Sequence, residues 1–175
     1  MRRACRLSGA VAVVLALLGA GGCGYSLRSG GNLPSSIQTV HIPVLENKTR
    51  EPGIEDFITQ ALTQAVVTAG RLKIAANAAS ADAVLEGSII GYSLTSLSFD
   101  SSANVTRYRL QIALALTLRD RQKNEVIWRQ DRIEERADFP VSGQVTVNLV
   151  REQDAVKRAA VDVSRAIVSL AFEGF

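Results

Sequence analysis

The clearest hydrophobic pattern of the chain lies between Arg107 and Arg119, where apolar residues alternate with small or polar ones. The apolar positions are Tyr108, Leu110, Ile112, Leu114, Leu116 and Leu118. Successive side chains of a β-strand point to opposite faces, so this pattern predicts a long strand with one buried face. A polar turn at 120–124 and the apolar Val126 and Trp128 predict a hairpin whose second strand covers about 125–135.

Three further segments have the pattern of strands. Residues 37–45 predict a short strand, in which Pro43 indicates an edge position or a strand end. A small strand is expected at 72–75. Residues 83–99 predict a long strand whose inward face changes parity after Ile89, and Gly87 and Gly91 indicate that a β-bulge makes the change.

Two segments have the spacing of amphipathic helices. The first covers 53–69, with Gly70 placed to end it, and the second covers about 150–172. The first apolar stripe contains Ile54, Phe57, Ile58, Ala61, Leu62, Ala65 and Ala69, and the second contains Val156, Ala159, Ala160, Val163, Ile167, Leu170 and Ala171.

These elements predict an α/β fold of the α+β type, with the order β-α-β-β-β-α. Two helices with one apolar stripe each, and a sheet with one strongly apolar face, bury their apolar surfaces in two layers. We therefore expect a two-layer sandwich with two helices packed on a mainly antiparallel or mixed four-stranded sheet. One domain at 37–175 accounts for the length of the chain.

The first 22 residues have the three regions of a secretory signal peptide. Arg2, Arg3 and Arg6 precede an apolar run at 10–18, and small residues lead to Cys23. The apolar run is shorter than the roughly 20 residues of a membrane-spanning helix. A cysteine after two glycines resembles a lipobox, so we expect cleavage before Cys23 and lipid attachment to its thiol and amino group. Plain secretion, with Cys23 as a free thiol, is the alternative.

Processing at Cys23 changes two other expectations. The chain has 20 Lys and Arg residues against 17 Asp and Glu, and the loss of three arginines with the signal peptide leaves 17 against 17. The basic isoelectric point is then no reason to expect nucleic acid as a partner. Residues 23–36 form a turn-rich tether, and the thirteen residues between Cys23 and Ile37, at about 3.3–3.6 Å each, reach about 45 Å at most.

The candidate chemistry of the domain is sparse. His41 is the only histidine, so a zinc site or a Ser-His-Asp triad lacks parts. Asp82 with Glu86, and Glu134 with Glu135, are possible carboxylate pairs, but solvated charge on strands explains them equally. We expect neither an enzyme nor a bound cofactor or metal.

Basic residues gather at both ends of the predicted hairpin. A turn near Gln122 places Arg107 and Arg109 beside Arg132 and Arg136 at the open end, whereas Arg119, Arg121 and Lys123 lie at the turn. Either cluster can bind an anion. The alternative is cross-strand neutralisation, in which Glu134 and Glu135 lie opposite the first two arginines.

Short motifs in a fixed order, from Cys23 to the C-terminus, resemble the LptE family of lipopolysaccharide-assembly lipoproteins. They are CGYSLR at 23–28, LP at 33–34, IPVLENKT at 42–49, GIE at 53–55, ADAVLEG at 81–87, Tyr108-Arg109, Trp128 and the last helix. The resemblance implies helices on a four-stranded sheet, a lipid anchor in the outer membrane, and a seat inside the β-barrel protein LptD, which passes lipopolysaccharide to the cell surface.

The resemblance also suggests a ligand for the arginines. Lipopolysaccharide carries phosphates, and the planar guanidinium binds phosphate through two hydrogen bonds. We therefore expect Arg107, Arg109, Arg132 and Arg136 to bind lipopolysaccharide. The family also uses basic residues near the loop that here covers 100–104, which has no cation before Arg107.

Two other functions fit the sequence. Residues 42–49 and 82–87 also resemble a family of α/β lipoproteins that activate peptidoglycan synthases. Such activators cross the periplasm on long linkers, and a tether of about 45 Å favours the barrel partner. A generic periplasmic binding module is the third interpretation, but it explains none of the ordered motifs.

Overall fold

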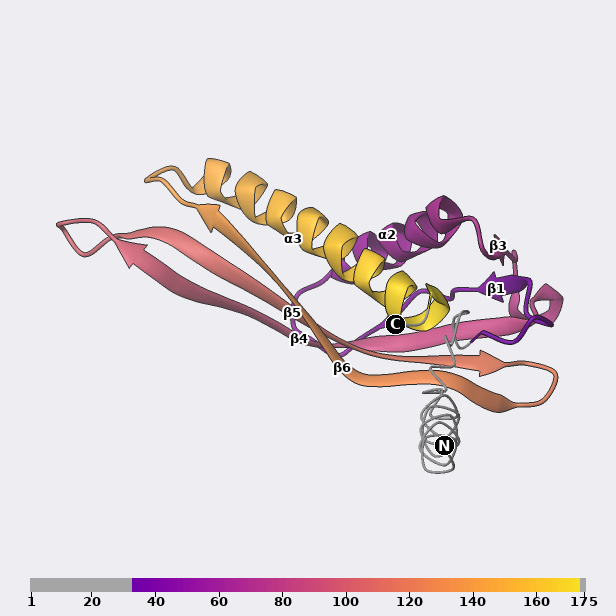
Figure 1. The fold of residues 1–175 in the computed structure, drawn as a ribbon. Coiled ribbons are helices and arrows are strands. Elements are labelled where there is room, and N and C mark those ends of the chain that lie inside the picture. Colours follow the sequence, from indigo (N-terminus) through magenta and orange to yellow (C-terminus); the bar gives the residue numbers. More distant parts are fainter. Residues whose placement is uncertain (1–32, 174–175) are drawn as a thin grey trace, which may run out of the picture.

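The computed structural model describes residues 33–173. Within this part of the chain, helices α2 (Ile54–Ala69) and α3 (Val145–Val168) lie on the same face of a six-stranded sheet (Figure 1). The strands are β1 (Thr39–His41), β2 (Glu46–Asn47), β3 (Lys73–Ile74), β4 (Ala83–Phe99), β5 (Val105–Asp120) and β6 (Glu125–Pro140). A 3-10 turn, η1 (Ala78–Ser80), precedes β4, and a π-helical turn, η2 (Ser169–Glu173), follows α3.

The strands are arranged in the order β3-β1-β4-β5-β6, and β2 pairs with β4 beyond β1. The three long strands are antiparallel, whereas β1, β2 and β3 pair in parallel. The predicted two-layer α+β class is confirmed, but the sheet has six strands rather than four. The predicted strand at 37–45 is limited to β1, Thr39–His41, before Pro43, which has no N–H to donate to a ladder. The additional strands are β2, which was not predicted, and β3, which corresponds to the small strand expected at 72–75.

The core lies between the helices and one face of the three long strands. The alternating residues of β5 from Leu110 to Leu118 are buried as predicted. Helix α2 buries Ile54, Ile58, Leu62 and Val66. The three alanines of its predicted stripe and Phe57 are only partly buried, and on the predicted α3 stripe Leu170 is exposed.

The element boundaries agree with the sequence where glycine marks them. Gly53 and Gly70 have φ angles of 84° and 67° at the two ends of α2, and the Gly70 N–H donates to the carbonyls of Val66 and Val67. Strand β6 continues to Pro140 rather than ending near Glu135, and α3 begins at Val145 rather than near Val150. The first turns of α3 bury no apolar stripe, and Val145 is 73 % exposed. The hydrophobic pattern therefore could not predict where this helix begins.

Candidate functional site

One face of the long strands is not covered by any helix of the described part of the chain (Figure 1). We call it the open face. Residues paired across antiparallel strands point to the same side, so the pairs Ser88–Ala115 and Glu86–Thr117 both belong to it. The centre of the open face is made of small side chains, whereas charged residues follow on β6 and toward the ends of β5.

The predicted arginines lie on this open face, but with acidic partners between them. Arg109 pairs with Asp138 across the strands and donates two hydrogen bonds to its carboxylate, from Nε at 2.7 Å and from Nη2 at 2.9 Å. These hydrogen bonds hold the pKa of Asp138 below its usual value. The pair is part-exposed, so it fixes side-chain geometry more than it stabilises the fold.

Arg132 and Arg136 share one carboxylate. Arg132 donates from Nε to Glu134, and Nη2 of Arg136 lies 3.6 Å from the other oxygen of the same group. Gln111 also donates to Glu134, at 2.8 Å. Glu134 thus orders two arginines and one amide on two neighbouring strands.

Arg107 is the outermost member of the group. It pairs with Pro140 across the strands, and it makes no ion pair with any residue of the described range. Its charge contributes to lowering the pKa of Asp138. Among the four predicted arginines, Arg107 therefore has the guanidinium that is most available to an anion.

The predicted cross-strand partners of the arginines were wrong in register. Arg107 and Arg109 face Pro140 and Asp138, whereas Glu134 and Glu135 face Ala113 and Ile112. The cause is a pair of register shifts, one between Leu114 and Leu116 and one between Leu118 and Arg119. Each β-bulge places an extra residue on one strand and displaces every later pair.

The second predicted basic cluster lies at the opposite end of the hairpin. Arg119 contacts Asn124 at 3.4 Å, and Nε of Arg121 donates to the carbonyl of Ala81 at 2.8 Å. The carboxylate of Asp120 accepts from the backbone N–H groups of Gln122 and Lys123. Arg121 and Asp120 therefore order this turn.

The other candidate groups have structural contacts. Asp82 accepts the N–H groups of Gln38 and Thr39 and the Thr39 hydroxyl, and these hydrogen bonds lower its pKa, the hydroxyl most. Nδ1 of His41 lies 3.1 Å from the carbonyl of Ala75, and Glu86 is exposed. No group of three or more His, Cys, Asp or Glu side chains within 33–173 has the arrangement of a metal site.

The predicted signal peptide and lipidated cysteine are outside the described residues. The structure therefore leaves the expectations for 1–22 and for Cys23 as predictions. Of the helices that it describes, none combines the length and the apolar character needed to span a bilayer.

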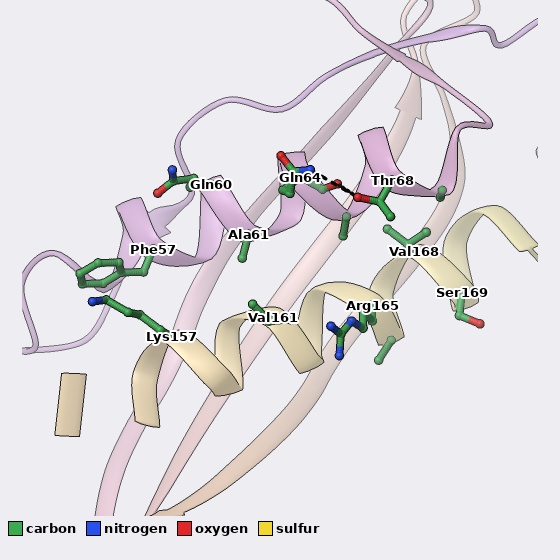
Figure 2. Close-up of a pocket in the computed structure, with 13 residues that line it drawn as sticks. Phe57, Gln60, Ala61, Gln64, Thr68, Lys157, Val161, Arg165, Val168 and Ser169 are labelled. Atoms are coloured by element: carbon green, nitrogen blue, oxygen red, sulfur yellow. Dashed lines mark hydrogen bonds between the residues drawn. The ribbon is translucent and has the colours of Figure 1, made fainter. Parts of the chain in front are cut away.

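A groove between α2 and α3 was not predicted from the sequence. It has a volume of about 940 Å³ and lies on the outer side of the helix pair, away from the sheet core (Figure 2). Phe57, Ala61, Ala65 and Ala69 line it from α2. The sequence signal was ambiguous, because alanines at this spacing fit a buried stripe and a groove wall equally.

Comparisons with known proteins agree on family and fold. The family model LptE, described as lipopolysaccharide-assembly, matches residues 37–170. No curated protein sequence is close enough to count as a match.

Solved structures of low sequence identity share the fold. A lipoprotein B from Nitrosomonas europaea is 19 % identical, with a TM-score of 0.51 over 84 % of this chain and 92 % of that chain. A protein from Xanthomonas campestris is 12 % identical, with a TM-score of 0.54 over 83 % and 88 %. The PelC dodecamer subunit from Paraburkholderia phytofirmans is 14 % identical, with a TM-score of 0.51 over 82 % and 95 %.

Proposed function

The chain belongs to the LptE lipopolysaccharide-assembly family, and we propose that it is an outer-membrane lipoprotein that binds the β-barrel LptD and assists lipopolysaccharide insertion. The observation that carries this proposal is the family match over residues 37–170, which includes every described strand and the whole of α2 and α3. In this proposal the chain is a binding partner and catalyses no reaction.

The open face supports a protein partner at the sheet. Ser88, Ala113, Ala115 and Thr117 make its centre small. Ser88 and Ala113 are buried, whereas Ala115 and Thr117 are part-exposed. Small side chains let another backbone approach closely. In monomeric proteins, a sheet face that no helix covers usually carries polar residues. The small side chains at the centre of this face depart from that rule. We therefore propose that this face lies against the inner wall of the barrel.

Crosslinking tests the complex with LptD. A photoreactive residue at Gln111 or Thr117, both on the open face, is expected to capture a large outer-membrane β-barrel in intact cells. The measurement is mass spectrometry of the captured protein. Capture of a peptidoglycan synthase instead would favour the alternative function as an activator of that enzyme.

The arginine group supports the ligand part of the proposal. The expected placement of Arg107 and Arg109 beside Arg132 and Arg136 is wrong in detail, because Arg107 lies opposite Pro140 and Arg136 lies opposite Gln111. The four guanidiniums form a row along β5 and β6 that extends about 26 Å from Arg132 to Arg107, at about 3.3 Å per residue. Arg109 and Arg136 are the close pair from the two strands. Asp138 and Glu134 neutralise part of their charge. Strands hold these side chains more rigidly than a turn does, so less ordering is needed when a phosphate binds.

Charge reversal at Arg107 and Arg136 tests the lipopolysaccharide site. The double change Arg107→Glu and Arg136→Glu is expected to weaken lipopolysaccharide binding by about tenfold or more, because charge-assisted hydrogen bonds to phosphate are lost. Barrel association and thermal stability should change little. The control variant carries Glu at Arg119, Arg121 and Lys123, and loss of binding in the control alone would place the site at the turn.

The lipid anchor is tested at Cys23. We expect Cys23→Ser to leave a folded protein that no longer partitions into membranes, because two or more acyl chains are needed for stable anchoring. The measurement is membrane fractionation in cells that lack the barrel partner. Unchanged outer-membrane fractionation of the variant would contradict the proposed lipid anchor.

A further inference from the structure

The groove between α2 and α3 lies outside the sheet-based site proposed above. The two helices are side by side, so that Phe57 faces Lys157 near one end and Thr68 approaches Val168 and Ser169 near the other (Figure 2). Residues 57–68 of α2 line one wall over about 17 Å, at about 1.5 Å of rise per residue. The groove is therefore about three helical turns long.

The groove is lined mainly by apolar side chains, and cationic side chains lie along one of its walls. Ala61, Ala65, Ala69, Ala166, Val161 and Val168 supply apolar lining, and none of its thirteen lining residues has a carboxylate. The two cationic side chains, Lys157 and Arg165, both come from α3. The polar groups of the opposite wall are the amides of Gln60 and Gln64 and the Thr68 hydroxyl.

The two cations are not equally available. Arg165 shares its charge with Asp162, at 3.2 Å from Nη1. Lys157 makes no ion pair within the described residues, and its Nζ lies 5.6 Å from the centre of the Phe57 ring. A cation held over an aromatic face at the mouth of an apolar groove is well placed to bind an anionic head group.

The dimensions favour a small ligand over a polypeptide. A stable protein interface buries about 800 Å² on each partner, usually around large aromatic anchors. Here the apolar lining from α2 consists of three alanines and Phe57, which offer little area to a partner helix. A volume of about 940 Å³ falls in the range of about 300–1,000 Å³ that is typical of small-molecule sites.

We propose that this groove binds one acyl chain of an anionic phospholipid, with the phosphate beside Lys157. The apolar lining of Ala61, Ala65 and Val161 contacts the chain. The ammonium of Lys157 pairs with the phosphate, and the Gln60 amide is available to the glycerol part. This site is separate from the arginine group on the open face and does not depend on the barrel partner.

Photolabelling tests the groove directly. The purified full-length protein is placed in phosphatidylethanolamine vesicles that contain phosphatidylglycerol with a photoreactive group in its acyl chain, and labelled peptides are mapped. We expect labelling within 57–69 and 157–169. Ala65→Trp, which fills the groove, should abolish this labelling, whereas Val67→Trp on the exposed side of α2 should retain it.

A neighbouring cation supplies the charge control. Lys157→Gln is expected to reduce labelling about tenfold, the size expected for one charge-assisted contact to phosphate, and Arg158→Gln should leave it unchanged. Arg158 is exposed and does not line the groove. Thermal unfolding of each variant shows whether the fold is intact.

Three outcomes would overturn the proposal. They are equal labelling of the Lys157 and Arg158 variants, crosslinks from the groove to a second copy of the chain or to another protein, and labelling by photoreactive lipopolysaccharide but not by the phospholipid. Capture of the barrel through Gln111 or Thr117 is measured separately, so failure here leaves the proposed function unaffected.

Discussion

Replacing Gly87 with valine is expected to destabilise the domain by about 3 kcal/mol or more, because overpacking at this position has no cheap relief. Gly87 pairs with Leu116 in the middle of the β4–β5 ladder. A Cβ atom at Gly87 would overlap the Leu116 side chain and lie 2.5 Å from the carbonyl oxygen of Ala115. That oxygen belongs to the backbone of a central strand, so the sheet itself would have to shift.

Denaturant unfolding of purified variants measures this effect. Gly143→Ala is the matched control, because a Cβ there has no heavy atom within 4 Å and the backbone φ is not positive. We expect the control to change the free energy of unfolding by about 1 kcal/mol or less. If Gly87→Val unfolds at the same denaturant concentration as Gly143→Ala, the sheet has room for a side chain at Gly87. That result would contradict the close contact between Gly87 and the Ala115–Leu116 segment of β5.

The strand pattern made much of the fold predictable. Strict alternation from Tyr108 to Leu118 revealed one buried face of β5, and the parity change after Ile89 revealed a bulge, which the structure places between Ile89 and Gly91. Both signals come from burial on one face of a strand. The short strands β1, β2 and β3 are two or three residues long and carry too few positions for such a pattern, so β1 and β3 were predicted with longer bounds and β2 was missed.

The partners of the arginines could not be predicted for a related reason. Alternation places Arg107 and Arg109 on the face opposite the core whatever their partners are. Which residue of β6 lies opposite depends on two bulges in the β5–β6 pairing, and no glycine on β6 marks them. As a result, Asp138, rather than Glu134 or Glu135, is the carboxylate that binds Arg109.

The helix layer shows where an amphipathic pattern is ambiguous. Val66 is fully buried although it was not in the predicted stripe, whereas Ala61 and Ala65 line the groove. A helix that packs on a sheet and on a second helix has two contact surfaces, and small apolar residues satisfy either. The groove is formed by both helices together, so the pattern of either helix alone could not predict it.

Ala115→Trp is expected to abolish capture of the proposed barrel partner while leaving the fold intact. Ala115 lies on the open face, between the core-facing Leu114 and Leu116, and pairs with Ser88. An indole there projects from the sheet and holds any apposed wall away from the small side chains around it. Aromatic residues are favourable in strands, so the substitution itself should cost little stability.

The measurement is co-purification of the barrel with the Ala115→Trp variant, alongside its thermal unfolding. Val67→Trp is the matched control, because Val67 is 53 % exposed on α2, in the layer of helices on the other side of the sheet. We expect the control to retain the barrel. If Val67→Trp loses the barrel and Ala115→Trp keeps it, the helices rather than the open face contact the barrel wall, and our assignment of that face is wrong.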